Sequence, residues 1–250
     1  MSITGHNPDS PVAGGGHFVT THWSAVVRAG QVDAASAHVA LDELCQTYWY
    51  PLYAFIRRQG RAPQDAEDLT QAFFARLLEK NFVAAADPEK GKFRTFLLAA
   101  LKRFMANEWD RDHAQKRGGF QTVIAIDQAV VESRFNADLT HDLQPDVLFE
   151  RQWAMMLLER VMSLLQEEYV ATGRATLFEH LRSCLAKQEA TQSYALIAVE
   201  LKLTEAAVKT AVHRLRTRYR EILRSEIGKT VASPDEIETE LRHLFSTFGR

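Results

Sequence analysis

The chain has 250 residues, 46% of them apolar and 25% charged, which is enough for one large domain or two small ones with their own cores. No apolar run approaches the roughly 20 residues that span a bilayer, and the N-terminal segment lacks the features of a secretory signal. Two distant cysteines make neither a disulfide framework nor a zinc site, so we expect a cytoplasmic protein without a membrane association.

Helical periodicity dominates the first half, since apolar residues recur at spacings of three and four. A disordered tail rich in Gly, Pro and Ser is expected over residues 1–18, followed by a first domain over residues 19–119. The predicted elements of this domain are a short helix that Gly30 ends, a longer helix kinked or split at Pro51, and helices Gln64–Glu79 and Phe93–Asp112.

The second half is also predicted to be helical, after an acidic linker over residues 120–145 that contains the one strand-like run, Val123–Ile126. A domain over residues 146–232 and a C-terminal helix within residues 233–250 follow. The predicted elements are a long helix from Val147 that Gly173 ends, a helix Leu177–Leu185, two helices within Ser193–Arg224, and an amphipathic helix Glu236–Phe248. The fold class predicted is all-α, with two small helical domains joined by an acidic linker.

Charge is unevenly distributed along the chain, although the net charge of −2 argues weakly against a nucleic-acid binder. Residues 90–117 hold eight Lys/Arg and three Asp/Glu, and residues 205–224 hold six and two. Between them, residues 120–150 hold six Asp/Glu and one Arg. Two separated basic segments indicate two contacts on one long polyanion.

The segment Ser193–Arg224 is the most informative one. It predicts a helix Tyr194–Leu201, a turn over residues 202–204, and a second helix that Thr204 caps. At about 100° per residue, the second helix carries an apolar stripe (Val208, Val212, Leu215, Tyr219, Ile222) and a basic stripe (Lys209, His213, Arg216, Arg220, Arg224). One stripe can be buried while the other meets a phosphate backbone, as in a helix-turn-helix reader of duplex DNA. The alternative is an ordinary pair of basic amphipathic helices in a bundle.

The start of the second helix is expected to reach base edges and its later turns to reach phosphates. The candidate DNA-binding residues of this segment are Thr204, Glu205, Ala206, Lys209, Thr210 and His213 near the bases, and Arg214, Arg216 and Arg220 on the backbone.

Three blocks of the chain resemble bacterial RNA polymerase sigma factors of the extracytoplasmic-function (ECF) group of the sigma-70 family. TYWYPLYAFIRRQGRAPQDAEDLTQAFFARLLE resembles regions 2.1–2.2, GKFRTFLLAALKRFMANEWDRDHAQKRGG resembles regions 2.3–2.4, and SYALIAVELKLTEAAVKTAVHRLRTRYREIL resembles region 4. They follow each other in the family's order and cover somewhat under half of the chain. The resemblance implies a region 2-like first domain and a region 4-like second one.

The resemblance implies that the acidic block docks on core RNA polymerase, whose clamp helices in the largest subunit and whose flap are the expected partners. The matching residues are Asp65, Glu67, Asp68, Leu69, Gln71 and Phe74. Two other interpretations remain open: the acidic side chains can simply complement the helix dipole, or three carboxylates within four residues can hold Mg²⁺. No further ligand pattern completes such a site, so no metal is expected.

The second block resembles the segment that reads the promoter −10 element, which needs stacking surfaces together with positive charge. The matching residues are Lys92, Arg94, Lys102, Arg103, Asn107, Trp109 and Arg111. For Phe93 a place in the core is the favoured interpretation, and for Trp109 core and base contact both stay open. The helix-turn-helix would then read the −35 element of the promoter DNA.

Four features depart from the family's pattern. Lys202 stands at a turn position where such sequences often have Gly, and a positive φ there would be strained, which predicts a differently shaped turn. Ala206, Ala207 and Ala211 replace polar residues, so the promoter sequence is not predicted. The linker is long and acidic, and a helix follows Pro234; that helix either completes the domain core or restrains DNA binding.

The sequence therefore predicts an alternative sigma factor that binds core RNA polymerase and directs promoter-specific initiation. The runner-up is a stand-alone helix-turn-helix regulator that never contacts polymerase. No catalytic motif is present, so we expect no enzyme, no catalytic residue and no cofactor. An anti-sigma factor or a regulatory kinase could act on the protein, and the sequence does not decide between them.

Overall fold

A computed structural model describes residues 47–79, 91–112, 128–138, 143–186, 194–231 and 233–249. These residues form helices and no strand, which confirms the predicted all-α class. Within them, no helix is both long enough and apolar enough to cross a membrane. The expected tail, the helix before Gly30 and the strand-like run Val123–Ile126 lie outside the described residues.

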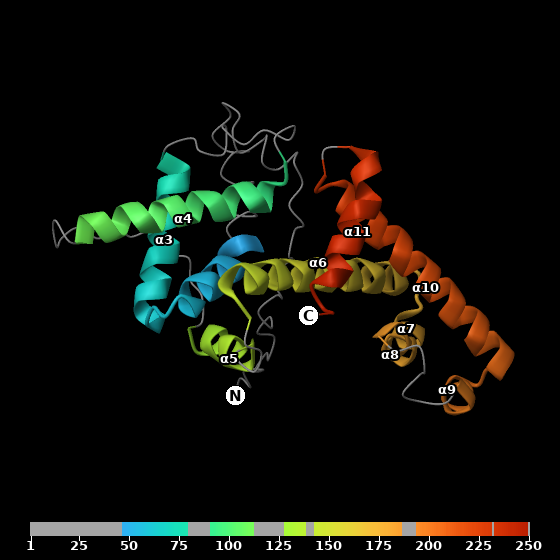
Figure 1. The fold of residues 1–250 in the computed structure, drawn as a ribbon. Helices are drawn as coiled ribbons and strands as arrows, with labels where there is room; N and C mark the ends of the chain where they lie inside the picture. The colour runs from blue at the N-terminus through green and yellow to red at the C-terminus, as the bar shows by residue number, and fades with distance from the viewer. Residues whose placement is uncertain are drawn as a thin grey trace, which may run out of the picture.

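The first half of the fold is built on aromatic side chains. Residues 47–58 are helical without interruption, so Pro51 does not split this helix, one of the two predicted outcomes. α3 (Pro63–Glu79) and α4 (Phe93–Asp112) follow close to their predicted bounds. α3 and α4 cross each other in Figure 1. Phe73 of α3 and Phe104 of α4 have ring centroids 5.6 Å apart, and Phe93 packs edge-on against Tyr48 at 5.6 Å. Phe93 is therefore a core residue, as predicted.

The expected linker contains a helix, α5 (Gln128–Asp138), that packs against the first half. Val131 and Phe135, four residues apart, are buried, and the ring of Phe135 meets that of Tyr53 edge-on. Glu132 lies between them in sequence and accepts hydrogen bonds from Tyr53 and Arg57. A helix of only three turns carries a weak periodic signal, so its place in the core emerges only once its partners are folded.

Helix α6 (Pro145–Ala171) connects the two halves of the molecule. At 27 residues it is about 40 Å long, and in Figure 1 it runs across the middle of the view from the first group of helices to the second. Near its start Trp153 contacts Arg94 of α4, and near its end Tyr169 packs on Phe178. Gly173, with φ +69°, ends the helix as predicted. Because α6 serves both halves, their buried side chains form one continuous cluster.

The second half contains α7 (Ala175–Leu181), α8 (Ser183–Ala186), α9 (Tyr194–Leu201) and α10 (Glu205–Gly228). The single helix predicted over Leu177–Leu185 is divided at Arg182. The helix-turn-helix has its predicted bounds, and Thr204 Oγ1 accepts a hydrogen bond from the backbone N–H of Ala207 at 3.2 Å, which confirms the cap. The turn is not reshaped: Lys202 itself adopts φ +54°.

After α10 the chain turns back through a short 3₁₀ helix, η3 (Pro234–Glu236), into α11 (Ile237–Ser246), which packs on α10. Leu244 is fully buried, and the other members of the predicted apolar face divide: Ile237 and Leu241 are half-buried, whereas Phe245 is 58% exposed. Only part of the predicted face therefore completes the core.

Candidate nucleic-acid interface

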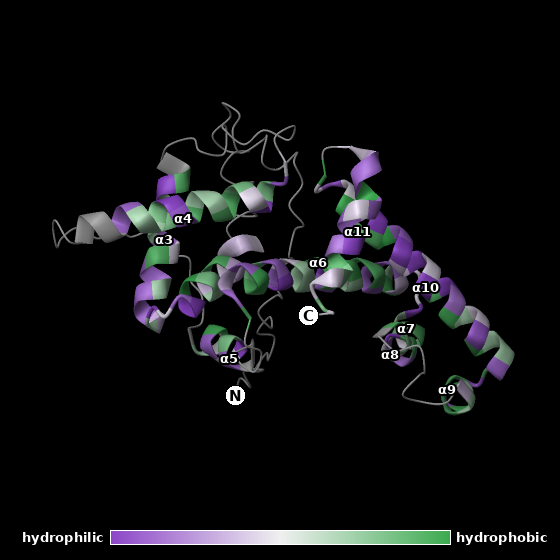
Figure 2. Cartoon of the chain, viewed as in Figure 1, coloured by the Kyte–Doolittle hydropathy of each residue, from purple (hydrophilic) through white to green (hydrophobic). Residues whose placement is uncertain are grey.

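The helix-turn-helix presents the first turns of α10 to solvent. All members of the predicted apolar stripe are buried or half-buried, so the opposite side of the helix is left exposed. Figure 2 shows the resulting alternation of hydrophilic and hydrophobic residues along α10. The exposed residues near its start are the ones expected at base edges: Thr204, Glu205, Ala206, Lys209, Thr210 and His213.

Several polar residues of α10 are engaged within the protein. Lys209 pairs with Glu205 at 2.9 Å on the exposed face, one turn apart, and a hydrogen bond to Glu205 raises the pKa of the lysine. Arg216 is half-buried and donates to the backbone carbonyl of Cys184 from Nε (3.2 Å) and Nη2 (2.7 Å). Its guanidinium thus ties α10 to α8, whereas Arg214 and Arg220 are exposed.

Arg218 connects α10 to α6, and it was not among the functional residues predicted from the sequence. It donates to Glu168 of α6 from Nε (2.8 Å) and Nη2 (2.6 Å), and to Glu221 from Nη1 (2.8 Å). The hydrogen bonds from Arg218 lower the pKa of the Glu168 carboxyl. Glu168 lies 50 residues from Arg218 in the chain, so helical spacing could not predict this ion pair.

A hollow of about 380 Å³ lies beside the start of α10. Ala206, Thr210 and Arg214 line it from α10, and Tyr169 and Arg174 line it from the end of α6 and the following turn. The small side chain of Ala206 leaves this side of the helix open to close approach.

A second hollow, of about 240 Å³, lies between α3 and α4. Its apolar lining comes from Phe73, Leu77, Phe96, Ala99, Ala100 and Phe104, and its polar lining from Arg76, Arg103 and Asn107. Arg103 and Asn107, both expected at the −10 element, are exposed here beside an aromatic surface. This arrangement combines stacking surface with positive charge, as capture of an unstacked base requires.

Lys92, directly before α4, and Arg94 within it pair with carboxylates of other helices. Lys92 and Arg94 both pair with Glu240 of α11, and Arg94 Nε also pairs with Glu150 at 2.8 Å. Arg94 is only 3% exposed, and its guanidinium lies 3.8 Å from the centre of the Trp153 ring. Glu150 and Glu240 lie 56 to 148 residues from these cations in the chain, so no local sequence pattern predicts the ion pairs.

Further along α4, Lys102 pairs with Asp146 at the start of α6 and lies 5.7 Å from the centre of the Phe55 ring. The side chains of Trp109 and Arg111 lie outside the described residues.

Asp65 and Asp68, in the first two turns of α3, are exposed. The remaining residues expected at core polymerase are less accessible: Glu67, Leu69 and Gln71 are half-buried, and Phe74 is only 2% exposed in the core. Gln71 donates from Nε2 to Glu67 Oε1 at 3.3 Å, which orders this face of the helix.

Residues 44–115 match the family model of sigma-70 region 2. The chain therefore contains a sigma-70 region 2 domain. This domain supports a role in promoter recognition and transcription initiation. No curated protein and no solved structure matches the chain.

The match divides the expected contacts of the chain into two groups. Those assigned to polymerase (65–74) and to the −10 element (92–111) lie inside region 2, whose described part comprises helix 47–58, α3 and α4. Those assigned to the −35 element lie outside the matched residues, on a helix-turn-helix that follows region 2 in the chain.

Proposed function

We propose that this protein is a dissociable sigma factor of the ECF group, which binds core RNA polymerase and directs it to specific promoters. The observation that carries the proposal is the region 2 match together with a helix-turn-helix later in the chain that has an exposed polar face. The proposal assigns no catalytic step to this chain: it selects the promoter, and the polymerase carries out the chemistry.

The proposed contact with core polymerase is the exposed acidic side of α3. Asp65 and Asp68 are exposed in the first turns of the helix, with the half-buried Leu69 beside them, so an acidic rim borders an apolar centre. Such a surface suits a basic partner, because charge complementarity speeds association while the apolar centre supplies affinity. Phe74 supports this surface from the core.

A pull-down with core polymerase tests this contact. The double variant Asp65→Ala, Asp68→Ala should retain less polymerase than the unchanged protein, and Glu159→Ala, an exposed acid on α6, should retain as much. Undiminished retention by the double variant would place the polymerase contact elsewhere. No retention by the unchanged protein would remove the sigma-factor proposal itself.

The proposed −10 contact is the hollow between α3 and α4. Its aromatic lining can stack on an unpaired base, and Arg103 and Asn107 at its rim offer charge and hydrogen bonds. Asn107→Ala should reduce promoter opening, measured as permanganate reactivity of unpaired thymines in the polymerase complex. Thr95→Ala, an exposed change on the same helix away from the hollow, is the matched control.

The proposed −35 contact is the start of α10, held in a major groove by its exposed residues. Lys209→Ala should change the preferred sequence, since this side chain lies where base edges are expected, although its pair with Glu205 must open for contact. Selection from a randomised −35 element by the polymerase complex measures this. An unchanged preference would assign readout to other residues of the helix.

The alternative function is a stand-alone helix-turn-helix regulator. The region 2 match favours the sigma factor, because a regulator that acts alone has no need of that domain. Transcription in vitro with core polymerase on genomic DNA, with the start sites mapped, decides between them and reveals the promoter. Duplex binding without any new start site would favour the regulator.

A further inference from the structure

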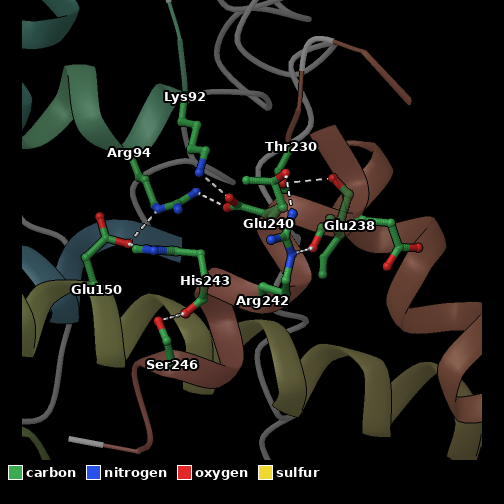
Figure 3. A network of polar contacts seen from close by, with 11 residues as sticks. Lys92, Arg94, Glu150, Thr230, Glu238, Glu240, Arg242, His243 and Ser246 are labelled. Carbon is green, nitrogen blue, oxygen red and sulfur yellow. Dashed lines mark hydrogen bonds and ion pairs between the residues drawn. The ribbon is translucent and has the colours of Figure 1, made fainter. Parts of the chain in front are cut away.

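A cluster of five polar side chains joins α11 to the start of α4; we call it the Glu240 clamp (Lys92, Arg94, Glu150, Glu240 and His243; Figure 3). Lys92 and Arg94 approach the Glu240 carboxylate from the first-half side. Below them, Glu150 of α6 accepts from Arg94 Nε at 2.8 Å and lies 3.0 Å from Nε2 of His243. The clamp therefore ties α4, α6 and α11 together.

The carboxylate at the centre of the clamp depends on its two cationic partners. The Glu240 side chain has no exposure to solvent, and burial by itself raises its pKa. Attraction and hydrogen bonds from Arg94, with a hydrogen bond from Lys92, outweigh burial and leave the pKa below its ordinary value. Glu240 is thus ionised at neutral pH and matched to a pair of cations, as a buried charge must be.

The residues that Glu240 engages are two of those expected to contact the −10 element. A third, Lys102, is paired with Asp146 of α6. By contrast, Arg103 and Asn107 on the hollow between α3 and α4 are exposed. In this conformation the proposed DNA surface of α4 is therefore divided, with its first residues covered by carboxylates from the second half of the chain.

The apolar attachment of α11 is small. The helix has ten residues, of which only Glu240 and Leu244 are buried. Complete burial of one leucine stabilises by about 1.5–3 kcal/mol, and the half-buried Ile237 and Leu241 add less. The ion pair between Glu238 and Arg224 of α10 is exposed on both sides and contributes little.

We propose that Glu240 is an internal competitor for nucleic-acid phosphate, so that α11 masks Lys92 until DNA displaces it. The inference rests on the proposed function, because it assumes that the start of α4 faces nucleic acid. If only open molecules bind nucleic acid, the apparent affinity of the protein is that of the open form multiplied by the fraction of molecules that are open. A mostly closed protein therefore binds weakly. When α11 leaves, Lys92 loses its partner Glu240 and can displace counterions from the strand, whereas Arg94 keeps its contacts with Glu150 and Trp153 of α6.

The test measures binding of a fluorescein-labelled, random-sequence 30-nucleotide single strand to the full-length protein at several salt concentrations. Glu240→Gln keeps the size of the side chain and removes its charge, so binding should become several-fold tighter at low salt. The slope of log K against log salt should steepen by about 0.7, the contribution of one released cation, Lys92, on a single strand. Glu238→Gln, which loses only the pair with Arg224, should bind as the unchanged protein does.

Binding by folded Glu240→Gln that is no tighter, or an unaltered salt slope, overturns the proposal, as does a lack of binding by both proteins. The unchanged protein gives a second test in case the variant does not fold: amide hydrogen exchange over residues 237–246 should accelerate when the oligonucleotide is added. Slower or unaltered exchange there also overturns the proposal. Neither measurement contains polymerase, so a failed pull-down with core polymerase would refute the proposed function while these outcomes still judge the clamp separately.

Discussion

The contact between Glu132 and the helix over residues 47–58 allows a quantitative test of whether α5 belongs to the folded first half. Glu132 accepts from Arg57 Nε at 2.9 Å and Nη2 at 3.1 Å, and from the hydroxyl of the buried Tyr53. Hydrogen bonds to charged groups contribute about 1.5–3 kcal/mol, and an unpaired buried hydroxyl costs about 1–3 kcal/mol. Because the Arg57–Glu132 pair is partly exposed, we expect Glu132→Ala to lower the free energy of unfolding by about 2–3 kcal/mol.

Urea denaturation monitored by circular dichroism measures this loss, which corresponds to a midpoint about 1 M lower for a slope of about 2–3 kcal/mol/M. Ser133→Ala, an exposed change on α5, is the matched control and should alter stability by less than about 0.5 kcal/mol. The hydrogen bond from Arg57 lowers the pKa of Glu132, so the contribution of its charge is present above the unfolded pKa and disappears as pH falls through the folded one. The gap between the unchanged protein and Glu132→Gln should therefore close below about pH 4. Equal stability of the unchanged protein and Glu132→Ala at pH 7 would refute the reasoning and leave α5 as a linker segment.

Three further predictions concern the helix-turn-helix. Thr204→Ala should cost about 1 kcal/mol in urea denaturation, because α10 loses its N-cap, and Thr204→Ser should restore it. Lys202→Gly should stabilise the protein by up to about 1 kcal/mol, since release of the left-handed strain exceeds the added chain entropy of glycine; a loss of stability would mean that the lysine side chain makes a contact of its own. Arg216→Ala should lower the free energy of unfolding by about 1–2 kcal/mol, because the Cys184 carbonyl loses its hydrogen bonds from the arginine. Arg220 is exposed, so Arg220→Ala should leave the urea midpoint unchanged and reduce the salt slope for duplex binding by about 0.9.

The sequence by itself predicted the elements whose apolar residues recur over several turns. The bounds of α4 and α9, the start of α10 with its Thr204 cap, and the glycine stop of α6 all follow from local spacing and backbone preference. Such features depend on neighbours within about four residues, so they are visible before any folding. The region 2 match has the same origin, because it follows one contiguous part of the chain.

Only the tertiary structure determined which partners the polar side chains contact. The same kind of prediction, a DNA contact, follows from the sequence for Arg94, Lys92 and Arg216. In the structure Arg94 is buried against Trp153, and Arg216 donates to the carbonyl of Cys184. The Glu240 carboxylate that pairs with Arg94 and Lys92 lies almost 150 residues away in the chain. Helical periodicity determines which face a side chain occupies, but an ion pair depends on which charge of another element the fold brings within reach, and only the assembled helices fix that distance.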